Sequence, residues 1–212
     1  KIGFNVAYRY WNKHNIYPNV YISLDKIVTE YHADEIHKMI YNKKIHIFIL
    51  DDVYFKKYPN DLNLINVYSY SLLKSCFNLI SLTPHITSGI LGVRLAIIMG
   101  FKQIEIHGMD GNYINFIPDS EKIVLNNKPI LRIKNIVSKN PNYFFDDYQQ
   151  IGDLYNIPNM DNTYKCFCNY HNGKIVTEKL HEYVMNVLFY DLKTLDIKYT
   201  YTEKPKILKI IS

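Results

Sequence analysis

Short apolar runs that end in polar residues recur along the chain and alternate with segments of helical spacing. Residues 20–24 (VYISL) run into Asp25, and residues 45–50 (IHIFIL) run into a pair of aspartates, which is typical of buried strands. Between these strands, residues 31–42 place apolar side chains at the spacing of a helix. Further strands are predicted at residues 78–82, 103–107 and 196–201, and further helices at residues 90–99, 177–195 and 207–211.

This alternation predicts an α/β fold with a mostly parallel, Rossmann-like sheet flanked by helices. Residues 112–163 have little periodicity and four prolines, so we expect a long irregular insertion there that serves as a loop or lid. No repeat or linker divides the chain, and residues 1–212 are therefore expected to form one domain. In such sheets ligands bind beyond the carboxyl ends of the strands.

Composition narrows the class of protein. With 48% hydrophobic and 21% charged residues the chain is not of the natively disordered class, and it contains no apolar run long enough to span a membrane. Its three cysteines favour a reducing, cytoplasmic location. The net charge of +5 comes from scattered lysines, which argues against a nucleic-acid partner but is compatible with peripheral contact to the inner face of a membrane.

The best chemical signal is the Thr87-Ser88-Gly89 turn before an apolar helix. A helix N-terminus offers free N–H groups and a positive dipole, and glycine lets a ligand approach the backbone, so the turn is a candidate phosphate site. An ordinary helix cap is the alternative. Asp110, between two glycines after a strand, either faces a ligand or forms an Asx turn.

Other motifs in the sequence are weaker evidence for a function. Neither GxGxxG nor GxxxxGK[ST] occurs, which argues against the common dinucleotide and P-loop sites. Cys166, Cys168 and His171 do not have the spacing of a common zinc site, so we expect no metal.

The segment around the turn resembles a known signature. Residues 86–89 (ITSG), the apolar helix and residues 100–110 (GFKQIEIHGMD) are similar to a block in small bacterial sialyltransferases of lipooligosaccharide synthesis. The wider group with Maf-type glycosyltransferases and MptE-like pterin diphosphokinases shares this signature. Residues 3–25 and residues 140–148 (NPNYFFDDY) also resemble stretches of that wider group.

The resemblance implies a Rossmann-like nucleotide-sugar-binding domain. It further implies an inverting glycosyltransferase that moves a sugar from a nucleotide-activated donor, with a CMP-sugar expected, to a surface or cell-envelope glycan without a cofactor. The expected donor-binding residues are Asn5, Asp25, Thr87, Ser88, Gly89, Asn112 and Tyr143, and the expected catalytic residues are Asp110, Asp147 and Tyr148.

Two alternatives stay open. One is an MptE-like diphosphokinase that uses ATP and magnesium, with Asp25, Asp51 and Asp110 as metal ligands. The other is a non-catalytic relative that binds a glycan or a protein partner. The family has a strand and a phosphate-binding loop that nothing before Gly3 matches, so the chain is expected either to lack that first strand or to hold the donor differently.

Overall fold

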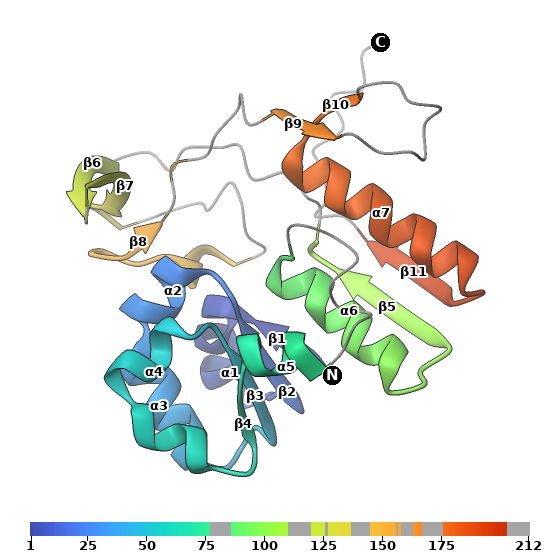
Figure 1. The fold of residues 1–212 in the computed structure, drawn as a ribbon. Helices are drawn as coiled ribbons and strands as arrows, with labels where there is room; N and C mark the ends of the chain where they lie inside the picture. The colour runs from blue at the N-terminus through green and yellow to red at the C-terminus, as the bar shows by residue number, and fades with distance from the viewer. Residues whose placement is uncertain are drawn as a thin grey trace.

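The computed structural model describes residues 1–76, 86–109, 120–125, 127–136, 145–155, 157, 163–166 and 176–202. Four parallel strands form the main sheet in chain order, which are β1 (Ile2–Phe4), β2 (Val20–Ser23), β3 (Ile47–Leu50) and β4 (Val67–Ser69). A second parallel pair consists of β5 (Gln103–His107) and β11 (Lys198–Thr202). The α/β class with a parallel sheet is thereby confirmed (Figure 1).

Helices connect and cover these strands (Figure 1). The first half of the chain contains η1 (Asn5–Ala7), α1 (Tyr8–His14), α2 (Lys26–Tyr31), α3 (Ala33–Tyr41), α4 (Val53–Lys57), η2 (Pro59–Asn63) and α5 (Tyr70–Cys76). Two longer helices follow, α6 (Ser88–Ile98) and α7 (Leu180–Thr194). In the described part of the chain, no helix is both long and apolar enough to cross a bilayer.

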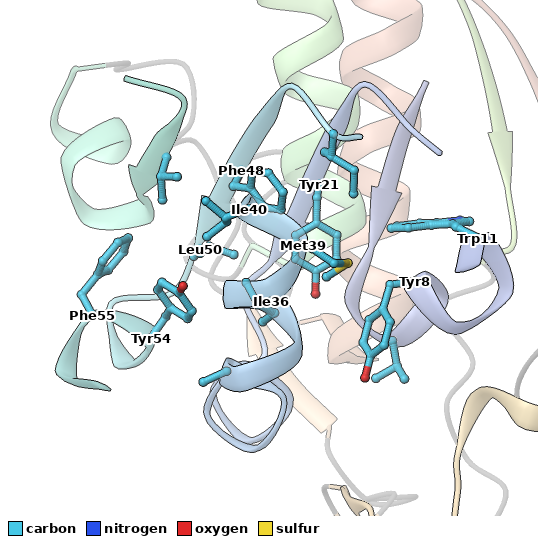
Figure 2. Close-up of a cluster of buried hydrophobic side chains, with 14 of the residues drawn as sticks. Tyr8, Trp11, Tyr21, Ile36, Met39, Ile40, Phe48, Leu50, Tyr54 and Phe55 are labelled. Carbon is cyan, nitrogen blue, oxygen red and sulfur yellow. The ribbon is translucent and has the colours of Figure 1, made fainter. Parts of the chain in front are cut away.

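The main sheet is buried on both faces, which explains its nearly continuous apolar runs. Side chains alternate along each strand, so Tyr21 and Phe48 point to one face and Ile22 and Ile49 to the other. On the first face, aromatic and aliphatic side chains from α1, α3 and α4 pack against the sheet (Figure 2). On the second face, Leu91 of α6 packs against the strands.

Most of the predicted elements are confirmed. The strands expected at residues 20–24, 45–50, 103–107 and 196–201 correspond to β2, β3, β5 and β11. The helices expected at residues 90–99 and 177–195 correspond to α6 and α7, although α7 begins only at Leu180 because residues 177–179 belong to a strand. The helix expected at residues 31–42 corresponds to α3, and α2 before it was not predicted. The predicted strand at residues 78–82 and helix at residues 207–211 lie outside the described residues.

Within residues 112–163 the described residues contain more regular structure than the sequence indicates. A small antiparallel sheet is built from β6 (Ser120–Leu125), β7 (Lys128–Ile133) and β8 (Leu154–Tyr155), and η4 (Asp146–Tyr148) precedes β8. A further antiparallel pair is formed by β9 (Thr163–Cys166) and β10 (Val176–Lys179). β8 pairs with β7 across some twenty residues of sequence, so local periodicity could not reveal this sheet.

Two glycines allow close packing around β1. A Cβ atom on Gly92 of α6 would lie 2.7 Å from the Phe4 ring, so the helix approaches the strand only because that atom is missing. On Gly3 the added atom would overlap the indole ring of Trp11, which lies across β1 on the other face. β1 is therefore enclosed between α6 and the Trp11 ring.

We expect Gly3→Ala to lower the free energy of unfolding by about 1–3 kcal/mol, because the buried Trp11 ring must move to admit the methyl group. Chemical denaturation measures this change. Trp11→Leu supplies the control, since Gly3→Ala introduced into that background should cost much less. Equal costs in the two backgrounds would show that the Trp11 contact is not the cause.

Candidate functional site

The carboxyl ends of β1 and β2 and the first residue of α6 meet at one hydrogen-bonded junction. Asn5 follows β1, and its side-chain oxygen accepts hydrogen bonds from the Ser23 hydroxyl at 3.3 Å and from the Ser88 hydroxyl at 3.2 Å. The Ser88 hydroxyl also accepts the Leu24 N–H at 2.9 Å. We call Asn5, Ser23 and Ser88 the junction. It fixes the start of α6 at the carboxyl edge of the sheet.

The backbone at the junction is unusual. Asn5 has a φ of 48°, in the left-handed region that asparagine tolerates better than most other residues. Its carbonyl oxygen accepts the Tyr21 hydroxyl at 2.9 Å from the neighbouring strand. The turn after β1 is thus held by both the main chain and the side chain of Asn5.

The three residues of the predicted phosphate site have different surroundings. Thr87 is the N-cap of α6, and its hydroxyl accepts the Ile90 N–H at 3.3 Å. The Ser88 hydroxyl is buried and bonded within the junction, so its polar contacts go to the protein. Gly89 lies beneath a side chain, because a Cβ atom there would be 2.7 Å from the sulfur of Met109.

Met109 connects this site to the second parallel pair of strands. It follows β5 after Gly108, which has a φ of 68°, and the Tyr201 hydroxyl of β11 donates to its carbonyl oxygen at 2.9 Å. Asp110 is the next residue in the chain. Asp110, Asn112 and Tyr143 themselves lie outside the described residues.

The acidic residues at the strand ends serve local structure. The Asp25 carboxylate accepts the N–H groups of Ile27 and Val28 at 3.0 and 3.2 Å and so caps α2. Asp51 accepts the Val53 N–H in the same way before α4. In the described part of the chain, no three His, Cys, Asp or Glu side chains gather as metal ligands.

A segment from the second half of the chain is attached beside the junction. The Val6 N–H donates to the Tyr148 hydroxyl at 3.4 Å, and Arg9 donates to the Tyr148 carbonyl oxygen at 2.8 Å. Tyr148 therefore lies next to Asn5. Asp147 instead pairs with Lys13 at 2.9 Å on the exposed side of α1.

Sequence reasoning missed a buried polar cluster that holds this segment in place. Arg9 forms a two-point ion pair with Asp153, and His32 Nε2 lies 4.0 Å from the same carboxylate. His32 Nδ1 is 3.0 Å from the Tyr8 hydroxyl, so a neutral imidazole can accept from Tyr8 while its Nε2–H faces Asp153. Nothing in the sequence marks these residues, because they come together only through the fold.

Burial controls the protonation of this cluster. It lowers the pKa of His32 to about 4, with the positive charge of Arg9 acting in the same direction and Asp153 and Glu35 opposing. It also raises the pKa of Tyr8 to about 12. Both side chains are therefore neutral at pH 7.

A comparison of the chain with protein-family models, curated proteins and solved structures gives no match.

We expect substitutions at Thr87 and Ser88 to distinguish the stability that the helix cap contributes from the stability that the junction contributes. Thr87→Ala should cost about 1 kcal/mol of stability, because it removes the helix cap. Ser88→Ala should cost about 1–3 kcal/mol, because it leaves the Leu24 N–H and the Asn5 oxygen short of a partner. Thermal and denaturant unfolding measure both, with Thr87→Ser as the control that keeps the cap. A Ser88→Ala protein as stable as the parent would contradict the junction.

The His32 cluster predicts a dependence of stability on pH. Since the pKa of His32 is about 4 in the folded chain and 6.5 ordinarily, the unfolded chain binds more protons between these values. Its contribution to stability is complete above pH 6.5 and is lost as the pH falls toward 4, by about 3 kcal/mol in total. Denaturant unfolding across this range should show a smaller decline for His32→Gln. If the stability of His32→Gln falls as much as that of the parent between pH 6.5 and 4, other titrating groups cause the loss.

Proposed function

We propose that this chain is a glycosyltransferase that transfers a sugar from a nucleotide-activated donor to a glycan of the cell surface or envelope. The observation that carries the proposal is the junction, which holds the N-terminus of α6 at the carboxyl edge of a parallel sheet. In Rossmann-like proteins this edge binds the nucleotide, with its phosphates at a helix N-terminus. The resemblance of residues 86–110 to sialyltransferases supports the same donor class and favours a CMP-sugar.

The proposed reaction is a single displacement. The acceptor hydroxyl oxygen forms a bond to the anomeric carbon while the bond from that carbon to the donor phosphate breaks, and the nucleotide leaves with the bonding electron pair. A carboxylate takes the hydroxyl proton. The positive end of the α6 dipole stabilises the charge that develops on the departing phosphate.

Of the two candidate bases, Asp110 fits this reaction better than Asp147. Asp110 follows Met109, whose side chain covers Gly89, whereas the Asp147 carboxylate is paired with Lys13 on the exposed side of α1. Tyr148 is buried beside Asn5 with its hydroxyl bonded to the Val6 N–H, so in this proposal it supports the turn after β1 rather than taking part in proton transfer. The proposal thus gives Asp110 the proton transfer and Tyr148 a positioning role.

The magnesium-dependent alternative has less support. Two of its three proposed ligands, Asp25 and Asp51, use carboxylate oxygens to accept backbone N–H groups of the following helices. A metal ion would have to share or displace these contacts. The transferase therefore remains the preferred function, with the reaction placed in the cytoplasm.

We expect CMP to raise the melting temperature of the parent chain without metal, because a ligand that binds the folded state stabilises it in proportion to concentration over Kd. UDP, GDP and ATP, each with and without magnesium, complete the panel. Gly89→Val should abolish the shift by CMP, since the new side chain blocks approach to the helix N–H groups.

The control addresses the contact between Gly89 and Met109. Met109→Ala alone should still bind CMP, while Gly89→Val combined with Met109→Ala relieves the crowding and should fold without binding it. A folded double variant that binds CMP as tightly as the parent would remove Gly89 from the site. A shift by ATP that requires magnesium would favour the diphosphokinase.

A further inference from the structure

The turn between α6 and β5 ends the helix in a characteristic way. The Gly100 N–H donates to the Ile97 carbonyl oxygen at 2.9 Å, and the Phe101 N–H donates to the Ala96 carbonyl oxygen at 3.1 Å. Gly100 has a φ of 86°. These are the two hydrogen bonds of a Schellman motif, in which the residue after the left-handed position normally packs back onto the helix.

The turn between α7 and β11 repeats this construction. The Asp196 N–H donates to the Lys193 carbonyl oxygen at 3.2 Å, and the Ile197 N–H donates to the Leu192 carbonyl oxygen at 2.9 Å. Asp196 takes the left-handed position with a φ of 53°. Both α6 and α7 therefore end in a turn of the same type before the next strand.

The side chains at equivalent positions of the two turns differ in how much of their surface is exposed. Ile197 packs back as the motif requires and is only 5% exposed, whereas its counterpart Phe101 is 54% exposed. The residue before the left-handed position is large, apolar and exposed in both turns, with Met99 at 54% and Leu195 at 51%. Packing within the described residues does not use these three side chains, so their exposure calls for another explanation.

The two turns lie side by side. β5 and β11 are parallel, with Gln103 paired to Lys198, and the Lys198 N–H donates to the Lys102 carbonyl oxygen at 3.0 Å. Both turns are seen on the right-hand side of Figure 1. The exposed apolar residues of both turns are consequently gathered at one end of the molecule. We call residues 99–102 together with residues 193–199 the paired turns.

Positive charge surrounds these apolar side chains. Lys102, Lys193 and Lys198 are exposed, and within the described residues none of them forms an ion pair. The paired turns contain one acidic residue, Asp196. The surface therefore combines apolar tips with a net positive charge.

A shallow hollow adjoins the paired turns, with a volume of about 480 Å³. Three of its seven lining residues are aromatic, and two of these are tyrosines, a residue type that is enriched where a protein meets the headgroup region of a bilayer. Its lining residues are Phe189, Tyr190, Leu192, Lys193, Asp196, Ile197 and Tyr199.

We propose that the paired turns bind the surface of a membrane rich in anionic lipid. Met99, Phe101 and Leu195 would insert at the level of the headgroups, and the three lysines would contact the lipid phosphates. A second copy of the chain fits this surface less well. A two-fold contact would bring together two copies of a surface that has a net positive charge, and like charges at an interface are unfavourable.

The proposal also defines an orientation. The paired turns contain the C-terminal end of α6, whereas the junction contains its N-terminal end. An eleven-residue helix is about 16 Å long. The carboxyl edge of the sheet would therefore face away from the bilayer, at about this height above it or more. The proposal stands independently of the reaction proposed above.

The test is sedimentation of the full chain with vesicles. We expect binding to vesicles of phosphatidylcholine mixed with phosphatidylglycerol, little binding to phosphatidylcholine alone, and weaker binding at high salt. Replacing Lys102, Lys193 and Lys198 by glutamine should weaken binding about a hundredfold, at about fivefold per lysine. Phe101→Ser with Leu195→Ser should weaken it about tenfold or more.

Matched control variants replace lysines and an apolar residue on other surfaces of the protein. Lys56, Lys122 and Lys128 are exposed on α4, β6 and β7, and replacing them by glutamine removes the same charge. Ile65, 91% exposed, supplies the apolar control as Ile65→Ser. Absence of vesicle binding, equal binding to neutral vesicles, or an equal loss in the controls would overturn the proposal. So would a dimer in light scattering that Phe101→Ser disrupts while vesicles remain unbound.

Discussion

The side-chain oxygen of Asn5 is the point on which the arrangement of the described residues depends most. It receives the hydroxyls of Ser23 and Ser88, and so joins the ends of two strands to the start of a helix that comes some eighty residues later. Polar groups in such a place stabilise the fold only when they are all bonded. Because each partner is bonded in turn, the junction admits little variation in where α6 begins.

The same turn also anchors a segment from much later in the chain. Tyr148 accepts the N–H of the residue after Asn5, and Arg9 ties that segment down through Asp153. Segments separated by more than 130 residues thus share one short stretch of backbone. A shift of β1 would be transmitted both to α6 and to η4.

The sequence was sufficient to predict β2 and β3, because burial on both faces gives them uninterrupted apolar runs, and it also predicted β5, β11, α6 and α7. Strand β4 was not predicted, because it is three residues long and its middle residue is exposed. Strand β1 escaped prediction because three residues with two glycine-dependent contacts carry no periodicity. The antiparallel sheet of β6, β7 and β8 escaped because its pairing joins distant segments.

The candidate site could be predicted in part. Thr87 as a cap follows from its residue type. Asn5 was expected near Ser88 only through the family resemblance, and the two side chains are hydrogen-bonded. The hydrogen-bond partners of these side chains cannot be predicted from the sequence. Whether a carboxylate such as that of Asp25 faces a ligand or caps its own helix is decided by side-chain torsions, which the sequence leaves undetermined. The cluster of Arg9, His32 and Asp153 has no local pattern at all.

The side chain of Met109 covers Gly89 and so fills part of the candidate site. The Met109 side chain lies where a Cβ on Gly89 would be, and methionine is a flexible side chain, so a ligand that approaches Gly89 from this side binds only the fraction of molecules in which Met109 has moved. The apparent affinity for any ligand at that backbone is reduced by this fraction. Oxidation of the thioether to a sulfoxide would change the fraction, because a polar, stiffer group packs poorly against a helix start. If the proposed nucleotide binds here, its affinity is thus linked to the oxidation state of the Met109 sulfur atom.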